Sequence, residues 1–304
     1  MDAFNEETRF IINPSLRVIR GSDNEIIVRH GSRGRSSQRI VDERERGVLA
    51  DFVTAFAAGA AYKDVVQQFS GQEVEDIFQG LIDQGVLIEC DKSHYAFLVA
   101  GLGTKLPEPR VKHLRVIGSG ALADAFLKMM EDTLRDTIMI TRSENVTMDD
   151  EPHMIVCVSD SPNLPLFYDV NELALSYGIR WHAAYVDGPE VIVGPLYVPG
   201  MTGCFHDFDV IDEAGRSMRI DYLYGRMGTP VNGDGKLPLF VANMGASYLT
   251  ASVLQDLFGV GSFLEGYFLR IDLDRMEIIR QKLSRLARCP ACMGSRPDIR
   301  HPFL

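Results

Sequence analysis

The sequence predicts an α/β protein of two domains: a small winged-helix-like module at 1–105 and a larger, dinucleotide-binding-type α/β domain at 106–304. Residues 9–98 combine short strands with three amphipathic helices. Residues 100–113 contain two prolines and two glycines, which is typical of a linker and places the domain boundary near residue 105. An apolar strand at Leu114–Ile117 then leads into a glycine turn and an apolar-periodic helix.

Composition excludes several classes of protein. The net charge is −11 and the pI is about 5.1, which disfavours nucleic-acid binding through a basic surface. No apolar run approaches the ~20 residues of a membrane span, and the acidic N-terminus lacks the apolar core of a signal peptide. We therefore expect a cytoplasmic protein with no membrane partner, whose five cysteines do not form a disulfide framework.

In the first module, alternating and apolar runs predict three short strands between residues 9 and 42, followed by three helices and a hairpin. The strand segments are Phe10–Ile12 with Leu16–Ile19, then Glu25–Arg29, then Gln38–Val41. The helices are Glu43–Ala58, Tyr62–Phe69 and Gln72–Gln84, and the hairpin pairs Val86–Glu89 with Tyr95–Leu98.

A winged-helix-like module suggests DNA binding, but the charge of its third helix disfavours a transcription regulator. That helix carries only acidic charges (Glu73, Glu75, Asp76 and Asp83), so phosphates would repel it. The alternative is that an extended peptide adds as a strand to the sheet edge. Arginines of the glycine- and serine-rich loop could then meet acidic peptide side chains, or could simply form a solvated loop; they are Arg29, Arg33, Arg35 and Arg39.

The second domain continues with short apolar strands and two helices. The strands are Thr137–Ile140, Met154–Val158, Trp181–Val186, Val191–Val193 and Pro195–Val198 on either side of a turn, and Phe268–Asp272. One helix follows a cap at Asp160–Asn163 and runs through Ala174. A second helix, Phe240–Phe258, is rich in small residues and predicts either a core helix or a dimer face.

The glycine turn Gly118-x-Gly120-x-x-Ala123 has the pattern of a phosphate cradle at a helix N-terminus. A dinucleotide site also needs a carboxylate at the end of the second strand, where this chain has Thr141-Arg142. Arg142 could meet a 2′-phosphate, which leaves an NADP-linked oxidoreductase open. The other interpretation is a tight turn that only packs a helix on the sheet.

Cysteine spacing predicts a structural zinc site. Cys289-x-x-Cys292 is a zinc half-site, and Cys204 supplies a third thiolate. His206 or Asp207 could complete the set, and a decayed, empty site is the alternative. Cys90 and Cys157 are interpreted as inert core thiols.

Four segments together resemble the ThiF/MoeB ubiquitin-activating-like superfamily, and within it the ocin-ThiF-like branch. They are VIGSGALA, VSDSPNLPLFYDVNELA, GIRWHAAYVDGPEVIVGPLYVPGMTGCFHDF and the terminal RCPACM. The resemblance covers nearly the whole chain. Its most specific part is the run Val-Gly-Pro-Leu-x-x-Pro-Gly-x-x-x-Cys from Val193 to Cys204.

The resemblance implies a degenerate, non-adenylating scaffold without catalysis of its own. Active members of the superfamily use an acidic ribose anchor, phosphate-binding Arg and Lys residues and a magnesium-binding Asp. Asp160 and Asn171 match the family pattern, but Thr141-Arg142 replaces the ribose anchor, and no arginine lies between Asp160 and Asn171. ATP is therefore not expected to bind, and the turn of Gly118, Gly120 and Ala123 is interpreted as vestigial.

Proteins of this branch partner YcaO cyclodehydratases in making thiazole- and oxazole-modified microcins and bacteriocins. The first module resembles the RiPP recognition element, in which a precursor leader adds as a strand between the third strand and third helix. The resemblance implies a leader along Gln38, Arg39, Ile40 and Val41, with a groove lined by Val74, Ile77, Phe78 and Leu81.

The expected function is a scaffold that presents a precursor peptide to a YcaO enzyme for thiazoline or oxazoline formation. A homodimer is expected from the small-residue helix and from the superfamily. An active ATP-dependent, carboxylate-adenylating enzyme and an NADP-linked oxidoreductase are the competing hypotheses.

Overall fold

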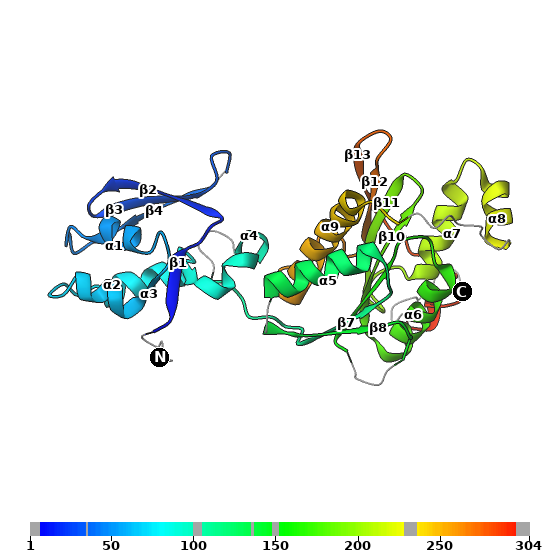
Figure 1. The fold of residues 1–304 in the computed structure, drawn as a ribbon, viewed down its shortest axis with the longest axis horizontal. Coiled ribbons are helices and arrows are strands. Elements are labelled where there is room, and N and C mark those ends of the chain that lie inside the picture. The colour runs from blue at the N-terminus through cyan, green and yellow to red at the C-terminus, as the bar shows by residue number, and fades with distance from the viewer. Residues whose placement is uncertain are drawn as a thin grey trace, which may run out of the picture. The chain divides into compact units, whose positions relative to one another are not determined.

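The structure, a computed structural model, describes residues 7–34, 36–99, 105–134, 137–147, 152–227 and 236–295. The chain divides into two compact units, Met1–Glu108 and Pro109–Leu304 (Figure 1). Arg35 of the predicted basic loop and residues 100–104 of the predicted linker lie outside the described residues. The predicted α/β class is confirmed, because helices pack on a large mixed sheet.

The first unit contains two three-stranded sheets. One is antiparallel in the order β2 (Leu16–Ser22), β3 (Glu25–His30), β4 (Ser37–Val41). The other is ordered β5 (Ala60–Ala61), β1 (Arg9–Ile12), β6 (Leu87–Glu89). The helices are α1 (Leu49–Ala55), α2 (Tyr62–Gln68), α3 (Glu75–Asp83) and α4 (Ala96–Val99).

Phenylalanines pack together within the core of this unit, which is otherwise mainly leucine, isoleucine and valine. Phe78 of α3 meets Phe10 of β1 edge-on with ring centroids 5.0 Å apart, and its ring lies 5.9 Å from that of Phe56. Phe52 of α1 contacts Phe56 at 5.5 Å. The core therefore joins α1, α3 and the strand β1.

Three predictions for this unit are wrong. Residues 9–42 form four strands rather than three, because Phe10–Ile12 and Leu16–Ile19 belong to separate strands in different sheets. The hairpin does not form, because β6 pairs with β1 and the chain then turns through a 3₁₀ helix (Cys90–Tyr95) into α4. The first helix begins at Leu49 rather than Glu43, because backbone N–H groups of residues 44 and 46 bond the Asp42 carboxylate and hold this segment as a loop.

The second unit contains a seven-stranded sheet in the order β13-β12-β11-β10-β9-β7-β8. Strands β8, β7, β9 and β10 are parallel to one another, and β11, β12 and β13 are added antiparallel. The strands are β7 (His113–Ile117), β8 (Met139–Ser143), β9 (Met154–Ser159), β10 (Arg180–Asp187), β11 (Glu190–Tyr197), β12 (Tyr267–Asp272) and β13 (Glu277–Lys282). The predicted turn at Gly194 is wrong, because β11 runs through Gly194 and Pro195.

Helices cover both faces of this sheet. They are α5 (Ala121–Leu134), α6 (Leu164–Tyr177), α7 (Phe205–Gly215), α8 (Arg219–Met227) and α9 (Leu239–Leu257). α5 and α9 pack together on one face, and α6 and α7 supply aromatic residues to the core on the other (Figure 1). Asn163 caps α6 as predicted, accepting a hydrogen bond from the backbone N–H of Leu166 at 3.3 Å.

The small residues of α9 belong to the core. Ala242 and Ala246 are fully buried, and a Cβ on Gly245 would lie 2.9 Å from the side chains of Leu122 and Val191. Small residues are needed here so that α9 can approach α5 and β11. This face is therefore not a free dimer surface, and a homodimer remains a prediction from the resemblance alone. Among the described residues, none of the helices has the length and apolar composition to cross a membrane.

Candidate functional site

An open groove of about 380 Å³ lies between β4 and α3 in the first unit. Within the described residues, β4 pairs with β3 alone, so its other edge is available for a further strand. Ile40 of β4 and Ile77 and Leu81 of α3 line the groove. The groove thus combines a free strand edge with apolar side chains.

The predicted peptide-binding residues separate into two groups. All four apolar residues of the predicted groove lie in the core, but only Ile77 and Leu81 also line the groove, together with Ile40 and Val41 of β4. Val74 precedes α3, and Phe78 packs on Phe10 and Phe56, so neither is among the residues that line the groove.

The other two predicted peptide-binding residues of β4 make side-chain contacts within the first unit. Gln38 hydrogen-bonds Gln84, just beyond α3, at 3.0 Å. Arg39 is exposed and pairs with Glu25 at 2.6 Å. Gln38 therefore helps to hold β4 beside α3, whereas Arg39 lies on the outer face of the sheet.

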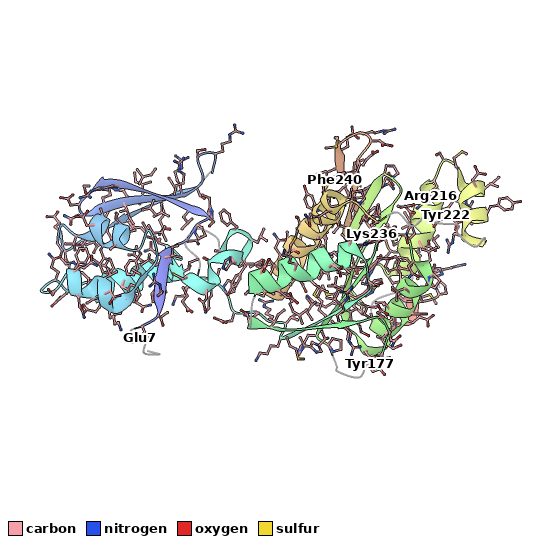
Figure 2. All side chains as sticks on the ribbon, viewed as in Figure 1. Glu7, Tyr177, Arg216, Tyr222, Lys236 and Phe240 are labelled. Atoms are coloured by element: carbon pink, nitrogen blue, oxygen red, sulfur yellow. The ribbon has the colours of Figure 1, made fainter. Side chains whose placement is uncertain are left out.

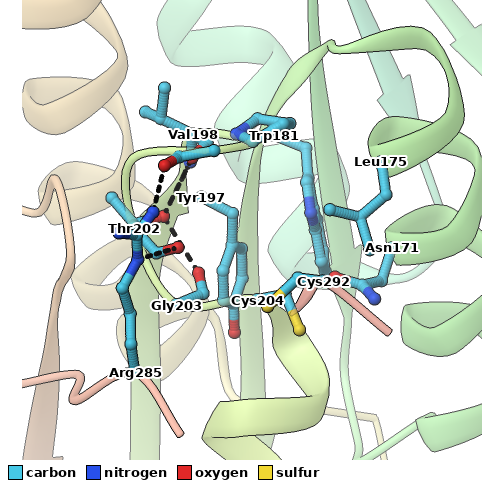
Figure 3. Close-up of a pocket in the computed structure, with 12 residues that line it drawn as sticks. Asn171, Leu175, Trp181, Tyr197, Val198, Thr202, Gly203, Cys204, Arg285 and Cys292 are labelled. Carbon is cyan, nitrogen blue, oxygen red and sulfur yellow. Dashed lines mark hydrogen bonds between the residues drawn. The ribbon is translucent and has the colours of Figure 1, made fainter. Parts of the chain in front are cut away.

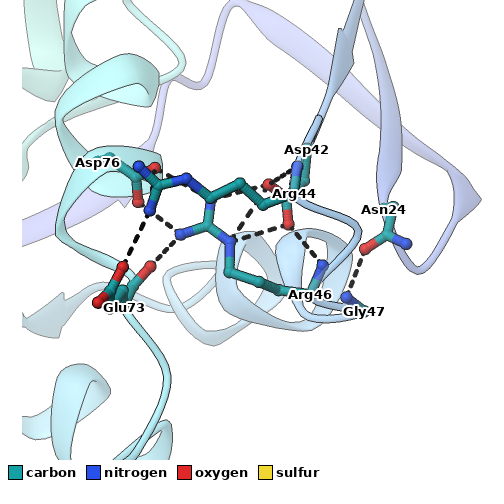
Figure 4. Close-up of polar contacts among 7 residues, drawn as sticks. All are labelled: Asn24, Asp42, Arg44, Arg46, Gly47, Glu73 and Asp76. Atoms are coloured by element: carbon teal, nitrogen blue, oxygen red, sulfur yellow. Dashed lines mark hydrogen bonds and ion pairs between the residues drawn. The ribbon is translucent and has the colours of Figure 1, made fainter.

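Arginines tie the end of β4 to the start of α3 beside the groove (Figure 4). Arg46 pairs with Asp42 at 2.8 Å and with Asp76 at 2.6 Å, and it also donates to the backbone oxygen of Glu73. Arg44 pairs with Glu73 at 3.0 Å. These contacts fix the width of the groove at one end. The i, i+4 spacing of Asp42 and Arg46 was the only sequence signal for them.

Asp42 should make this unit sensitive to acid. Hydrogen bonds from the Arg46 guanidinium hold the pKa of the buried Asp42 carboxyl at about 2, below its ordinary 3.8. A lowered folded-state pKa stabilises the fold above the ordinary pKa, and the stabilisation is lost as the pH falls from about 4 to about 2. It amounts to about 2 kcal/mol.

We therefore expect Asp42→Asn to lower the urea midpoint of the first unit at pH 6 and to have a much smaller effect, about a third as large, near pH 2.5. Asp51→Asn, which breaks only the exposed pair with Arg20, is the control and should change little at either pH. An equal loss for Asp42→Asn at both pH values would contradict this assignment.

The glycine turn in the second unit is filled by the chain's own polar groups. Gly118 and Gly120 have φ angles of 129° and 103° between β7 and α5. The Asp160 carboxylate accepts hydrogen bonds from the backbone N–H groups of Ala121 and Leu122, both at 2.8 Å. These are the groups that a phosphate at this helix N-terminus would use. A Cβ on Gly120 would overlap the same carboxylate.

The residues beside the glycine turn also make ion pairs and hydrogen bonds within the second unit. Arg142 pairs with Asp124 at 2.8 Å and donates to the backbone oxygen of Gly118 at 3.2 Å. Thr141 bonds the ring of His113, and Ala123 is fully buried. The sequence predicted the turn, but it gave no signal that Asp160, which follows β9, would occupy the helix N-terminus.

The structure brings the three predicted metal ligands together with Asp207. One donor atom from each of Cys204, Asp207, Cys289 and Cys292 lies within 4.8 Å of all the others. The Sγ atoms of Cys204 and Cys289 are 3.5 Å apart, close to the ~3.8 Å between thiolates of tetrahedral zinc and far from the ~2.05 Å of a disulfide. The cluster could therefore hold a metal.

Asp207, not His206, completes the group. Its carboxylate lies 3.5 Å from Cys292 Sγ and accepts a hydrogen bond from the backbone N–H of Cys204 at 3.0 Å, at the start of α7. His206 stays outside, and its buried Nδ1 has no partner among the described residues. Burial raises the pKa of the Cys204 and Cys289 thiols, so deprotonated thiolates need a cation beside them.

The surroundings of the cluster are buried (Figure 3). Asn171 of α6 accepts a hydrogen bond from the backbone N–H of Phe205 at 2.9 Å and so anchors the start of α7 beside Cys204. Trp181 stacks on Tyr197 next to it, with ring centroids 4.5 Å apart. Asn171 therefore has a structural role in holding the cluster.

No protein-family model and no curated protein matches the sequence. Solved structures do match. A heterocyclase in complex with substrate and cofactor has 15% sequence identity and a TM-score of 0.68, over 94% of this chain and 39% of that one. The heterocyclase TruD has 17% identity and a TM-score of 0.64, over 94% and 43%. The chain thus spans only about two fifths of these heterocyclases.

Escherichia coli MccB matches along nearly its whole length, with 15% identity and a TM-score of 0.51 over 93% of this chain and 97% of that one. Other structures of MccB contain ATP or N-formylated MccA. These likenesses establish the fold. They give no support to the expectation that ATP does not bind.

Proposed function

We propose that this chain binds the leader of a ribosomally made precursor peptide and presents the peptide to a YcaO cyclodehydratase for azoline formation. The observation that carries the proposal is the free edge of β4 beside a groove lined by both apolar and charged side chains in the first unit. Main-chain hydrogen bonds to β4 would supply affinity, and pockets for alternate side chains would supply specificity. The likeness to heterocyclases and to a protein crystallised with a peptide supports a role in peptide modification.

The direct test is a fluorescence-anisotropy titration of the full chain with a labelled leader peptide from a precursor encoded beside it. Saturable binding is expected, and an unlabelled copy of the leader should compete. Failure of every neighbouring leader to bind would refute leader capture. A pull-down with the neighbouring YcaO protein tests the proposed partner separately.

In this proposal the cysteine cluster holds a structural zinc, bound by the thiolates of Cys204, Cys289 and Cys292 with Asp207 as the fourth ligand. Zinc would fasten the segment around Cys289 to the start of α7. A site with four protein ligands leaves no open position for substrate, so its contribution is to stability.

A second candidate is a carboxylate-adenylating enzyme, favoured by the match to MccB along nearly its whole length. The chain lacks the acidic ribose anchor and the arginine that active superfamily members use, which argues against this candidate, whereas Asp160 at the first amides of α5 matches their magnesium-binding Asp. We expect no ATP–pyrophosphate exchange by the isolated chain, and no rise in its melting temperature with Mg-ATP. Exchange above the buffer control would establish the adenylating alternative instead.

An NADP-linked oxidoreductase has less support, because Arg142, its proposed phosphate ligand, pairs with Asp124. A titration followed by NADPH fluorescence tests it. Binding at micromolar concentration, lost in Arg142→Ala, would revive this alternative.

A further inference from the structure

A cleft of about 750 Å³ opens in the second unit, beside the carboxyl end of β10 and the first turn of α6. α7 and α8 supply its other wall, from which Figure 2 labels Arg216, at the end of α7, and Tyr222 of α8. In sheets with parallel strands, ligands bind beyond the carboxyl ends of the strands. The volume lies within the range of small-ligand pockets.

Ion pairs hold the α8 wall in place. Arg226 and the Tyr168 hydroxyl both bond Asp209, at 3.0 Å and 2.6 Å. Arg216 pairs with Asp187 at 3.0 Å and with Asp212 at 2.8 Å. The two guanidinium groups are thus paired with the three carboxylates of the lining.

Tyr185 supplies a hydroxyl group to the lining of this cleft. Its residue is 5% exposed, and its ring packs against Phe167 with centroids 5.3 Å apart. Its hydroxyl has no hydrogen-bond partner among the described residues, and the residue lines the cleft. Burial, together with the nearby charges of Asp212 and Asp187, raises the pKa of Tyr185 well above its usual range. The hydroxyl therefore remains a neutral donor.

The hydroxyl, the carboxylate and the net charge of the lining indicate which ligands fit this cleft. Tyr185 and Asp187 lie two residues apart on β10, so their side chains share one face of the sheet. Asp187 accepts from Arg216 through Oδ2, and its Oδ1 has no hydrogen-bond partner among the described residues. A neutral donor beside this carboxylate oxygen complements the C=O and N–H of an amide. The charged lining consists of three carboxylates and two guanidiniums, an excess of one negative charge that disfavours anions.

We propose that this cleft binds a neutral or positively charged segment of peptide, as a second contact in addition to the β4 edge. The proposal rests on the proposed function in one respect: the precursor peptide is the natural source of such a segment. A nucleotide, with its several negative charges, does not fit the lining.

The test uses the full chain labelled with 3-fluorotyrosine and observed by ¹⁹F NMR. Tyr185→Phe assigns the Tyr185 resonance, and the exposed Tyr177 is the internal control. The probes are the N-acetyl, N′-methylamide derivatives of arginine, glutamine and glutamate, and Mg-ATP. We expect the arginine and glutamine derivatives to shift the Tyr185 resonance saturably and to leave that of Tyr177 in place. The glutamate derivative should bind at least about fivefold more weakly, a difference of about 1 kcal/mol.

Asp187→Asn should reduce the preference for arginine over glutamate. A Tyr185 resonance that no derivative moves, or one that glutamate or Mg-ATP moves as readily as arginine, would overturn the proposal. These readouts are independent of leader binding at β4, so the two proposals can fail separately.

Discussion

The purified chain is expected to contain about one zinc ion per molecule, and Cys289→Ser is expected to lose it. Cys289 is fully buried and faces Cys204 at 3.5 Å, so its loss leaves an incomplete site and a buried hydroxyl. Structural zinc contributes about 10–16 kcal/mol in small zinc-finger peptides. The second unit has a large core of its own, so we expect a smaller loss of several kcal/mol, or about 10 °C in Tm.

Metal analysis by mass spectrometry and thermal melting measure the two effects. Cys90→Ser is the matched control, since Cys90 lies in the other unit and outside the cluster. Asp207→Asn separates two roles: it should weaken zinc binding if the carboxylate is a ligand and leave zinc content unchanged if it only caps α7. A wild-type chain without zinc, or a Cys289→Ser chain that retains it, would contradict the assignment.

The cysteine cluster shows what local sequence can and cannot predict. The spacing of Cys289 and Cys292 identified half the site, because two thiolates on one tight turn can share a metal. The choice between His206 and Asp207 depended on where α7 begins. With Cys204 at the N-cap, Asp207 falls at the third helical position, and its side chain turns back toward the cap.

For the β4–α3 groove, the sequence predicts the two elements but not which of their residues face the groove. Alternation along β4 and the apolar stripe of α3 located both elements, yet periodicity cannot tell which flank of a stripe meets the core. The contacts of Phe78 with Phe10 and Phe56 decide this, and those residues are distant in sequence. The same limit applies to Asp160 and to the Tyr185 cleft, because each depends on contacts between separate elements and carries no motif.

Gly80 offers a way to close the β4–α3 groove without disturbing the core. It lies inside α3 and lines the groove, and a Cβ added there would have no atom within 4 Å. A tryptophan at this position should project into the groove beside Ile40. We expect Gly80→Trp to weaken leader binding at least about tenfold, or about 1.4 kcal/mol, in the anisotropy titration.

Substitutions at Gly80 should raise the stability of the first unit, even where they weaken leader binding. A stability measurement therefore distinguishes a blocked groove from an unfolded unit. Glycine inside a helix costs about 0.5–1 kcal/mol relative to alanine, so Gly80→Ala should raise the urea midpoint slightly and leave leader binding unchanged. Gly80→Trp should fold at least as well as the wild type and yet bind poorly. If the tryptophan variant binds the leader with wild-type affinity, the peptide does not use this groove. Leader capture at the β4 edge would then have no structural support.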